Sequence, residues 1–316
     1  MRIGDRIRIR RFSRMDGEKQ VARLEKSRWP QDRAILVYAA EHGGTDRVRS
    51  WAVHGLPYPE EREELARIAS GHPDCYTRRS ALRKLQYPED RRTLLAVAEN
   101  DPDLSTAEEA VKKLPWPEER EQLLAMARGR RVPVAAIRQM DGREAREELE
   151  DMVLHSEDKS VRHAAIEQLD AELSREMLER FIMTRKPGSQ DRWEAVKKLC
   201  WPESREVLVH LVRTDPDDDI RAAALRALPW PEEEEIIRAV AVEPLKRVGK
   251  EFKNISVKAA AIRTMANAGV CVNCGGEMRE KTEELYEMWG DYDYATHYVT
   301  SWVCQQCGLT LKKCEV

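Results

Sequence analysis

The sequence predicts a mainly α-helical solenoid that ends in a small β module holding a metal ion. Two observations predict the solenoid: a turn signature recurs with a spacing of 29 residues, and a core pattern of alanine and aliphatic residues repeats in eight copies. A period of this size is typical of stacked helix pairs. A third observation, two Cys-x-x-Cys pairs near the C-terminus, predicts the metal.

The turn signature joins one helix pair to the next. Its clearest copy reads Leu-Pro-Trp-Pro-Glu-Glu-Arg at 114–120, and related copies lie at 56–62, 85–91, 199–205 and 228–234. Proline suits the first position of a helix, and acidic residues suit its first turn. We expect the aromatic residue before the proline to pack against the helix that follows, as in a hydrophobic staple.

The second helix of each pair carries the core pattern. Counting back from its last apolar residue, called position 0, alanine stands at −4 and an aliphatic residue at −3 in all eight copies. These positions share one helical face, and a small residue at −4 lets neighbouring helices approach closely. We therefore expect residues 29–269 to form the array, with position 0 at Leu56, Leu85, Leu114, Met140, Leu169, Leu199, Leu228 and Met265.

Turn and charge signals complete each pair. Asp-Pro-Asp stands between first and second helices at 101–103 and 215–217, and Val-Arg or Ile-Arg opens several second helices. On these features residues 29–269 resemble the HEAT-repeat family, although the period is shorter than that family's usual one and the aromatic-Pro-Glu turn is an addition. The resemblance implies a right-handed α-solenoid of about eight HEAT-like helix pairs. It also implies that a basic column at −7 ties neighbouring repeats to the turn aspartates, through Arg49, Arg78, Arg162, Arg192, Arg221 and Lys258.

The −2 column of the second helices is the candidate binding surface. It lies off the core face, so packing does not require a charge there, yet six of its eight residues are Lys or Arg. First helices are rich in glutamate instead, so the two surfaces of the array differ in charge. One interpretation is ordinary solvated charge, and the other is a basic groove for an acidic protein segment or a nucleic-acid backbone. The candidate residues are Arg83, Lys112, Arg138, Lys197, Arg226 and Arg263, with His54 and Glu167 completing the column.

Residues 1–28 form a basic N-terminal arm with ten basic and four acidic residues. The alternation at 6–10, Arg-Ile-Arg-Ile-Arg, resembles a strand with one apolar edge. The arm is either a solvated leader or a contact for an acidic partner or phosphates. Its candidate binding residues are Arg6, Arg8, Arg10 and Arg11.

Residues 270–316 differ in composition, with Thr, Val, Tyr and Trp replacing helix formers. Two Cys-x-x-Cys-Gly knuckles supply four thiolates, the ligand set of a structural zinc ion. They match the ligand positions of the zinc-ribbon family, which the segment resembles, and predict one structural Zn²⁺ held by Cys271, Cys274, Cys304 and Cys307.

The remaining cysteines and the nearby histidine lie outside the knuckles. Cys314 is a spare thiol, Cys75 and Cys200 are expected to pack in the array, and His297 is a poor substitute ligand. Aromatic residues of this module stand among acids, which favours a protein surface over nucleic acid. The period breaks at 243–254, where we expect an extended basic loop.

Composition and missing motifs limit the function. The net charge is −3, no apolar run approaches the length of a membrane span, and no phosphate loop or catalytic elbow is present. No histidine is followed by glutamate, which excludes the His-Glu iron ligands of HEAT-repeat deoxyhypusine hydroxylases. Trp51 and Trp193 on second helices could imitate HEAT-like DNA glycosylases, a minor alternative without a supporting motif.

We therefore expect a cytoplasmic, non-enzymatic adaptor. Its HEAT-like scaffold would bind protein partners, with the zinc ribbon as a second contact. The main alternative is a nucleic-acid-binding protein that uses the basic second-helix surface and the arm. We infer no membrane partner and no small-molecule substrate.

Overall fold

The computed structural model describes residues 3–248, 251–289 and 293–312, with side chains described outside 246–253 and 284–297. The chain divides into two compact units, Met1–Gln168 and Leu169–Val316, called unit 1 and unit 2 below. The sequence divided the chain differently, into 1–28, 29–269 and 270–316, and this three-part division remains a prediction.

Unit 1 is helical throughout the part that the structure describes. Its short connections place each helix antiparallel to the next one. Its helices are α1 (Ile3–Ser13), α2 (Gly17–Glu25), α3 (Arg33–His42), α4 (Asp46–Gly55), α5 (Arg62–Gly71), α6 (Cys75–Lys84), α7 (Arg91–Asn100), α8 (Leu104–Val111), α9 (Arg120–Arg128), α10 (Pro133–Ile137), α11 (Arg146–His155) and α12 (Lys159–Gln168).

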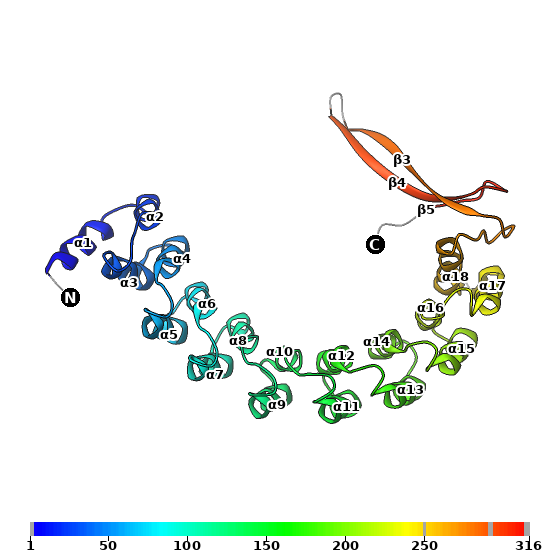
Figure 1. Ribbon diagram of the computed structural model, residues 1–316, viewed down its shortest axis with the longest axis horizontal. Coiled ribbons are helices and arrows are strands. Elements are labelled where there is room, and N and C mark those ends of the chain that lie inside the picture. Colours follow the sequence, from blue (N-terminus) through cyan, green and yellow to red (C-terminus); the bar gives the residue numbers. More distant parts are fainter. Residues whose placement is uncertain (1–2, 249–250, 290–292, 313–316) are drawn as a thin grey trace. The chain divides into compact units, whose positions relative to one another are not determined.

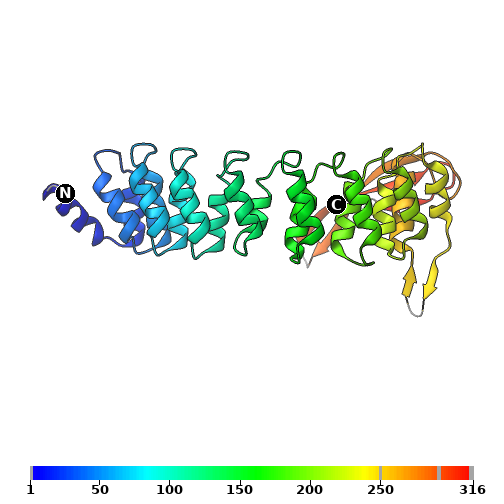
Figure 2. The same ribbon diagram turned by 90° about the horizontal axis from the view of Figure 1, so that it is seen from below.

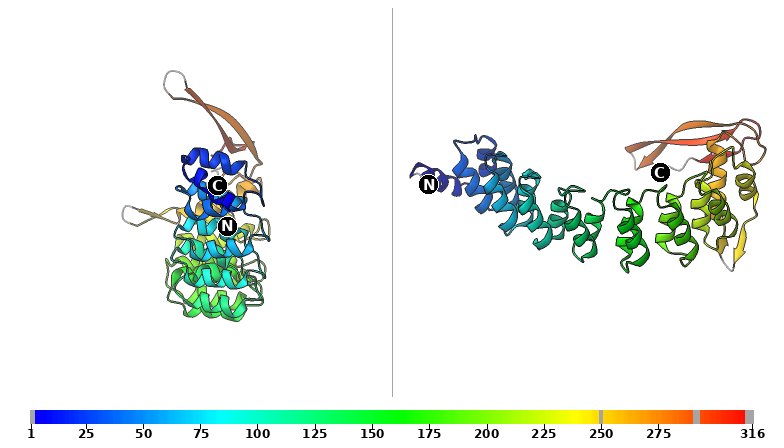
Figure 3. Two further views of the ribbon diagram at one scale, coloured as in Figure 1. Left: turned by 90° about the vertical axis from the view of Figure 1, so that its left-hand side faces the viewer. Right: turned by 60° about the horizontal axis from the view of Figure 1, so that its bottom comes forward.

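Unit 2 continues the helix pairs and adds strands. The hairpin of β1 and β2 projects from the helices of this unit (Figure 2). The second sheet is antiparallel, in the order β3-β4-β5, and follows α18 (Figure 3). The elements are α13 (Arg175–Thr184), α14 (Gln190–Lys198), α15 (Arg205–Thr214), α16 (Asp218–Arg226), α17 (Glu234–Val242), β1 (Lys246–Val248), β2 (Glu251–Lys253), α18 (Ile255–Asn267), β3 (Met278–Trp289), β4 (Asp293–Cys304) and β5 (Thr310–Lys312).

Helices from α3 onward form consecutive pairs. Each odd-numbered first helix packs on the even-numbered second helix that follows it, and within a unit second helices also pack on one another, as α4 does on α6 (Figure 1). The mainly helical, paired architecture and the small C-terminal sheet are therefore confirmed.

The predicted core positions are buried. Alanine at −4 is 0% exposed in all eight second helices, from Ala52 to Ala261, and position 0 is buried in all eight. The aliphatic at −3 is buried in seven copies and half-buried at Ile262. Burial of this apolar face therefore stabilises the helix pairs through the hydrophobic effect. The face itself follows from the local periodicity of the sequence.

The turn signature does join the helix pairs, but the proline is not the first helical residue. Helix α5 begins at Arg62, three residues after Pro59, and the same offset separates Pro88 from Arg91 in α7. Six aromatic–proline bonds in these turns are cis. The acidic residue before each of these arginines, Glu61 or Asp90, occupies the N-cap position. These two acids therefore lie in the turn and not in the first turn of the helix.

Two further expectations are corrected. The arm at 6–10 is not strand-like: it lies in α1, because a helix brings Phe12 into the core, where Gln20 donates a hydrogen bond to its carbonyl at 3.2 Å. The segment at 243–254 is not only an extended loop, since β1 and β2 pair antiparallel within it.

Candidate metal centre and second-helix surface

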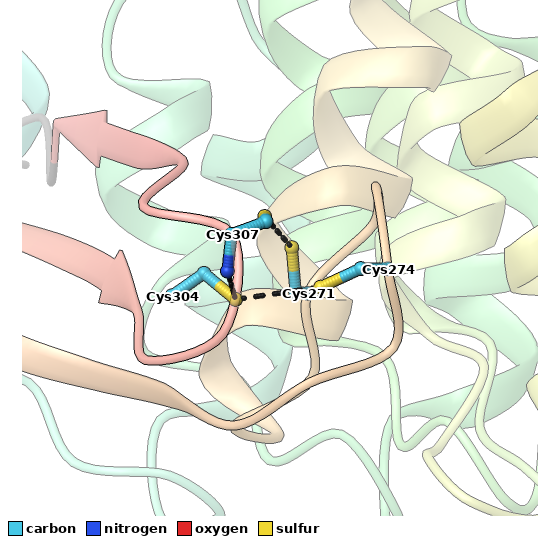
Figure 4. A group of neighbouring side chains, drawn as sticks. All are labelled: Cys271, Cys274, Cys304 and Cys307. Carbon is cyan, nitrogen blue, oxygen red and sulfur yellow. Dashed lines mark hydrogen bonds between the residues drawn. The ribbon is translucent and has the colours of Figure 1, made fainter.

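The four knuckle cysteines converge at the start of the C-terminal sheet. Cys271 and Cys274 follow α18, and Cys304 ends β4, with Cys307 in the turn before β5. The sulfur atoms of Cys271 and Cys307 are 3.7 Å apart and those of Cys274 and Cys304 are 3.5 Å apart (Figure 4). All four sulfurs lie within 4.8 Å of one another, so the structure brings together all four predicted ligands.

This geometry fits one tetrahedral ion. Zn–S bonds of about 2.3 Å in a tetrahedron separate the sulfurs by about 3.8 Å, close to the distances in the structure. All six cysteines in the described part are free thiols, so no disulfide competes for the knuckles. Of the two that were expected to pack in the array, Cys75 is half-buried and Cys200 is exposed. Four thiolates would complete the coordination shell of the ion and leave no position for substrate.

The two knuckles repeat the same backbone hydrogen bonds. The amide of Gly275 donates to the carbonyl of Cys271 at 2.8 Å, and the amide of Gly308 donates to that of Cys304 at 3.1 Å. Both glycines have positive φ, 74° and 71°, a conformation that a Cβ atom disfavours. The glycine after each cysteine pair, noted in the sequence, is thus required by the turn.

Backbone amides stabilise thiolate at two of the ligands. The Leu309 amide lowers the pKa of Cys307 to about 6, and the Cys307 and Gln306 amides lower the pKa of Cys304. Although the Gly276 amide donates to Cys274, burial and the neighbouring thiols raise the pKa of Cys274 to about 12. Four thiols this close cannot all ionise unless a cation compensates their charge, which is what a bound metal supplies.

The core below the cysteines is shared with α18. Ala266 of that helix packs with Met278 and Trp302 of the sheet and with Cys271 and Cys304. The Met278 amide also donates to the carbonyl of Gly269 at 2.8 Å. The ribbon is therefore attached to the last helix through a small apolar cluster.

The −2 column is exposed in every second helix, as predicted, but its charges differ in their partners. Lys112 lies 3.5 Å from Glu109, Arg138 lies 3.7 Å from Glu167, and Lys197 lies 3.2 Å from Glu194. Among the residues that the structure describes, no acidic partner is found for Arg83, Arg226 or Arg263. Only half of the six candidate cations are thus free of neighbouring carboxylates.

The arm residues also separate into two kinds. Arg8 donates to the carbonyl of Gln31 at 2.8 Å and lies 3.2 Å from Asp32, so it fastens α1 to the turn before α3. The other three candidates, Arg6, Arg10 and Arg11, are exposed on α1. Arg8 therefore has a structural role within unit 1.

The −7 column connects neighbouring repeats as the resemblance implied. Arg78 forms two hydrogen bonds of 2.7 Å with Asp101, and both side chains are buried. Arg192 forms the equivalent buried pair with Asp215. Arg162 also donates to two carbonyls of its own turn, those of Ser156 and Glu157, at 2.8 and 2.9 Å.

Sequence reasoning missed a second ladder, at the turn signature. The arginine that starts a first helix pairs with the buried N-cap acid of the next first helix, 28 residues later. That constant spacing of Arg and Asp or Glu was the available signal. The pairs are Arg33 with Glu61, Arg62 with Asp90, Arg91 with Glu119 and Arg205 with Glu233.

Lysines at −1 were also missed. Lys84 donates to the carbonyls of Val53 and His54, at 3.0 and 2.6 Å, and so caps the C-terminal end of the preceding second helix. Lys113 caps α6 in the same way through the carbonyls of Arg83 and Leu85. Burial lowers the pKa of both lysines. The only sequence signal for this capping was a lysine next to the apolar residue at position 0. Such a lysine cannot be told from an ordinary surface lysine by sequence.

Comparisons with known proteins give no relative. No family model matches the chain, and neither a curated protein nor a solved structure matches it. Over the residues that were searched, no helix has the length and apolarity needed to cross a bilayer. His297, the poor substitute ligand, and Cys314, the spare thiol, lie outside the described side chains.

Proposed function

We propose that the protein is a non-enzymatic adaptor: a right-handed, HEAT-like α-solenoid of about eight helix pairs that binds protein partners in the cytoplasm. In this proposal Cys271, Cys274, Cys304 and Cys307 hold one structural Zn²⁺, and the ribbon is a second contact. Four thiolate ligands support a structural site because they leave no place for an activated water.

One observation carries the proposal. In all eight second helices the −4 residue is fully buried while the −2 residue is exposed. Each unit therefore presents a repeating, solvent-facing column that its own packing does not need. Stacked repeats commonly use such continuous surfaces for recognition.

The mixture of charges supports a protein partner over a nucleic acid. A polyanion requires several unpaired cations along its path, since each neutralised phosphate contributes to affinity through counterion release. Glu109 and Glu167 interrupt that path by pairing with Lys112 and Arg138. The unpaired Arg83, Arg226 and Arg263 keep nucleic-acid binding as the second candidate, whereas nothing in the described geometry favours a DNA glycosylase.

The test is affinity capture from nuclease-treated native lysate with the full-length, zinc-loaded chain. Its matched bait carries Arg83, Lys112, Arg138, Lys197 and Arg226 changed together to Glu. A protein retained at stoichiometric yield by the first bait and lost from the second is expected. A parallel capture uses untreated lysate. Recovery of nucleic acid alone from it, with no stoichiometric protein from either lysate, would contradict the adaptor and favour the second candidate.

A further inference from the structure

The first two second helices of unit 1 expose aromatic and basic side chains together. On α4, Arg47, Trp51 and His54 are spaced i, i+4, i+7, so they share one face of the helix. On α6, Tyr76 and Arg83 are spaced by seven and share the corresponding face. Trp51 is 37% exposed and Tyr76 is 60% exposed, so both aromatic side chains reach the solvent.

The two helices are held in one register by contacts at both ends. Near the start of α4, Arg49 donates to the hydroxyl of Thr77 at 3.0 Å, and Thr77 follows Tyr76 in α6. At the other end, Lys84 donates to the carbonyl of His54 at 2.6 Å, and Lys84 follows Arg83. These contacts fix the register of the two helices, in which Arg47 and Tyr76 hold equivalent positions, as do His54 and Arg83, so the backbone that carries the surface is organised before any ligand binds.

The charge of this surface is mainly positive, although Arg47 also lines a hollow with Asp16 and Glu18 at the start of α2. Neither Arg47 nor Arg83 forms an ion pair with a residue that the structure describes, and the nearby Asp46 is already bound by Arg49. This surface does not continue onto the next second helix, α8. There Glu109 stands at the repeat position that Trp51 holds on α4, and it pairs with Lys112. The patch is therefore limited to about two helices, shorter than the track that an extended polyanion needs.

Resting on the proposed adaptor function, we propose that this surface, defined by Arg47, Trp51, His54, Tyr76 and Arg83, binds a short peptide rich in acidic and aromatic residues. Carboxylates of the peptide accept hydrogen bonds from the two unpaired guanidinium groups. Its aromatic side chains pack on Trp51 and Tyr76 and cover apolar surface that water now contacts. Aromatic and arginine side chains together are the groups that dominate protein interfaces.

The experiment measures fluorescence anisotropy with the full-length, zinc-loaded chain. The probe is a labelled nonapeptide of three Glu-Glu-Tyr repeats, and the comparison probes are the same peptide with Lys in place of Glu and a labelled short oligothymidine. Only the acidic peptide is expected to bind. Arg47→Glu combined with Arg83→Glu, and separately Trp51→Ala combined with Tyr76→Ala, are each expected to weaken that binding at least about tenfold.

The matched control is Arg92→Glu, because Arg92 is an exposed arginine on the first helix α7. This change is expected to leave the affinity for the acidic peptide within about twofold, since rim charges away from a site contribute little. Circular dichroism of each variant verifies that the helices persist.

Three outcomes would overturn the inference: no binding of the acidic peptide, binding that survives both double variants, or tighter binding of oligothymidine that the same variants abolish. The last outcome assigns the surface to nucleic acid. If lysate capture still returns a stoichiometric protein with the Arg47→Glu, Arg83→Glu chain, the adaptor function stands and only this surface assignment fails.

Discussion

At the scale of single residues, the buried arginine–aspartate pairs decide how neighbouring repeats fit together. Arg78 and Asp101 are almost fully removed from water, so each ion depends on the other for its solvation. The guanidinium of Arg78 also donates to the carbonyl of His72 at 2.8 Å, and the hydrogen bonds with Asp101 raise the pKa of Arg78. Removing one partner leaves a buried charge that the rest of the site cannot satisfy.

We therefore expect Arg78→Met to lower the free energy of unfolding by about 3 kcal/mol, the usual cost of breaking a buried pair. Urea denaturation followed by circular dichroism measures it. Arg83→Met on the same helix is the control and should cost less than about 0.5 kcal/mol, because Arg83 is exposed. Adding Asp101→Leu to Arg78→Met should restore part of the stability. If Arg78→Met and Arg83→Met lowered the free energy of unfolding equally, the buried pair would not have the stabilising role given to it here.

At the scale of elements, we expect the C-terminal module to depend on a metal held by its four cysteines. Its described core contains few apolar side chains, with Met278 and Trp302 central, and a module this small requires a metal or disulfides to fold. The ribbon also shares Ala266 with α18, so losing the metal should affect the end of that helix.

Zinc removal by a chelator is accordingly expected to expose the amides of β3–β5 and of the last turn of α18 to hydrogen exchange, while α3–α8 keep their protection. Mass spectrometry of exchanged peptides measures this, and elemental analysis should give one zinc per chain beforehand. Cys307→Ser should lower the zinc content and reproduce the exchange pattern. Cys200→Ser, at an exposed cysteine of unit 2, should do neither; retention of zinc by Cys307→Ser would contradict the assignment.

At the scale of the whole molecule, acidic residues in the repeat contacts make stability depend on pH. Hydrogen bonds from Arg205 lower the pKa of Glu233 below its ordinary 4.5. Hydrogen bonds also lower the pKa values of Asp74 and Asp103 below 3.8, Asp74 despite its burial. A folded pKa below the unfolded one means that the unfolded chain binds protons more readily at acidic pH.

This stabilisation is therefore fully present at neutral pH and is lost as the pH falls from about 5 through the folded pKa values. We expect the midpoint of urea unfolding to decline over that range in the parent protein. Glu233→Gln should be less stable at pH 7 and should show a smaller decline. The exposed Glu232→Gln is the control; equal pH profiles for parent and Glu233→Gln would count against the contribution of this pair.

The sequence by itself determined the features that depend on local periodicity. The turn signature, the buried columns at 0, −3 and −4 and the four cysteines were all readable, because a helix face or a knuckle is specified within a few residues. The strand predicted at residues 6–10 of the arm was wrong, because alternating Arg and Ile residues are compatible with either a strand or a helix. The burial of Phe12 in the core favours the helix. Local pattern could not reveal that core.

Only the tertiary structure decided which charges are free. Arg33 pairs with an acid 28 residues away and Lys84 with carbonyls about 30 residues away, and such contacts exist only after repeats stack. The same stacking gives equivalent arginines different surroundings. Arg83 has no acidic partner among the described residues, whereas Arg138 lies beside Glu167. Equivalent positions of the repeat thus differ in whether their charge is neutralised, because neighbouring helices supply a carboxylate at some of them and not at others.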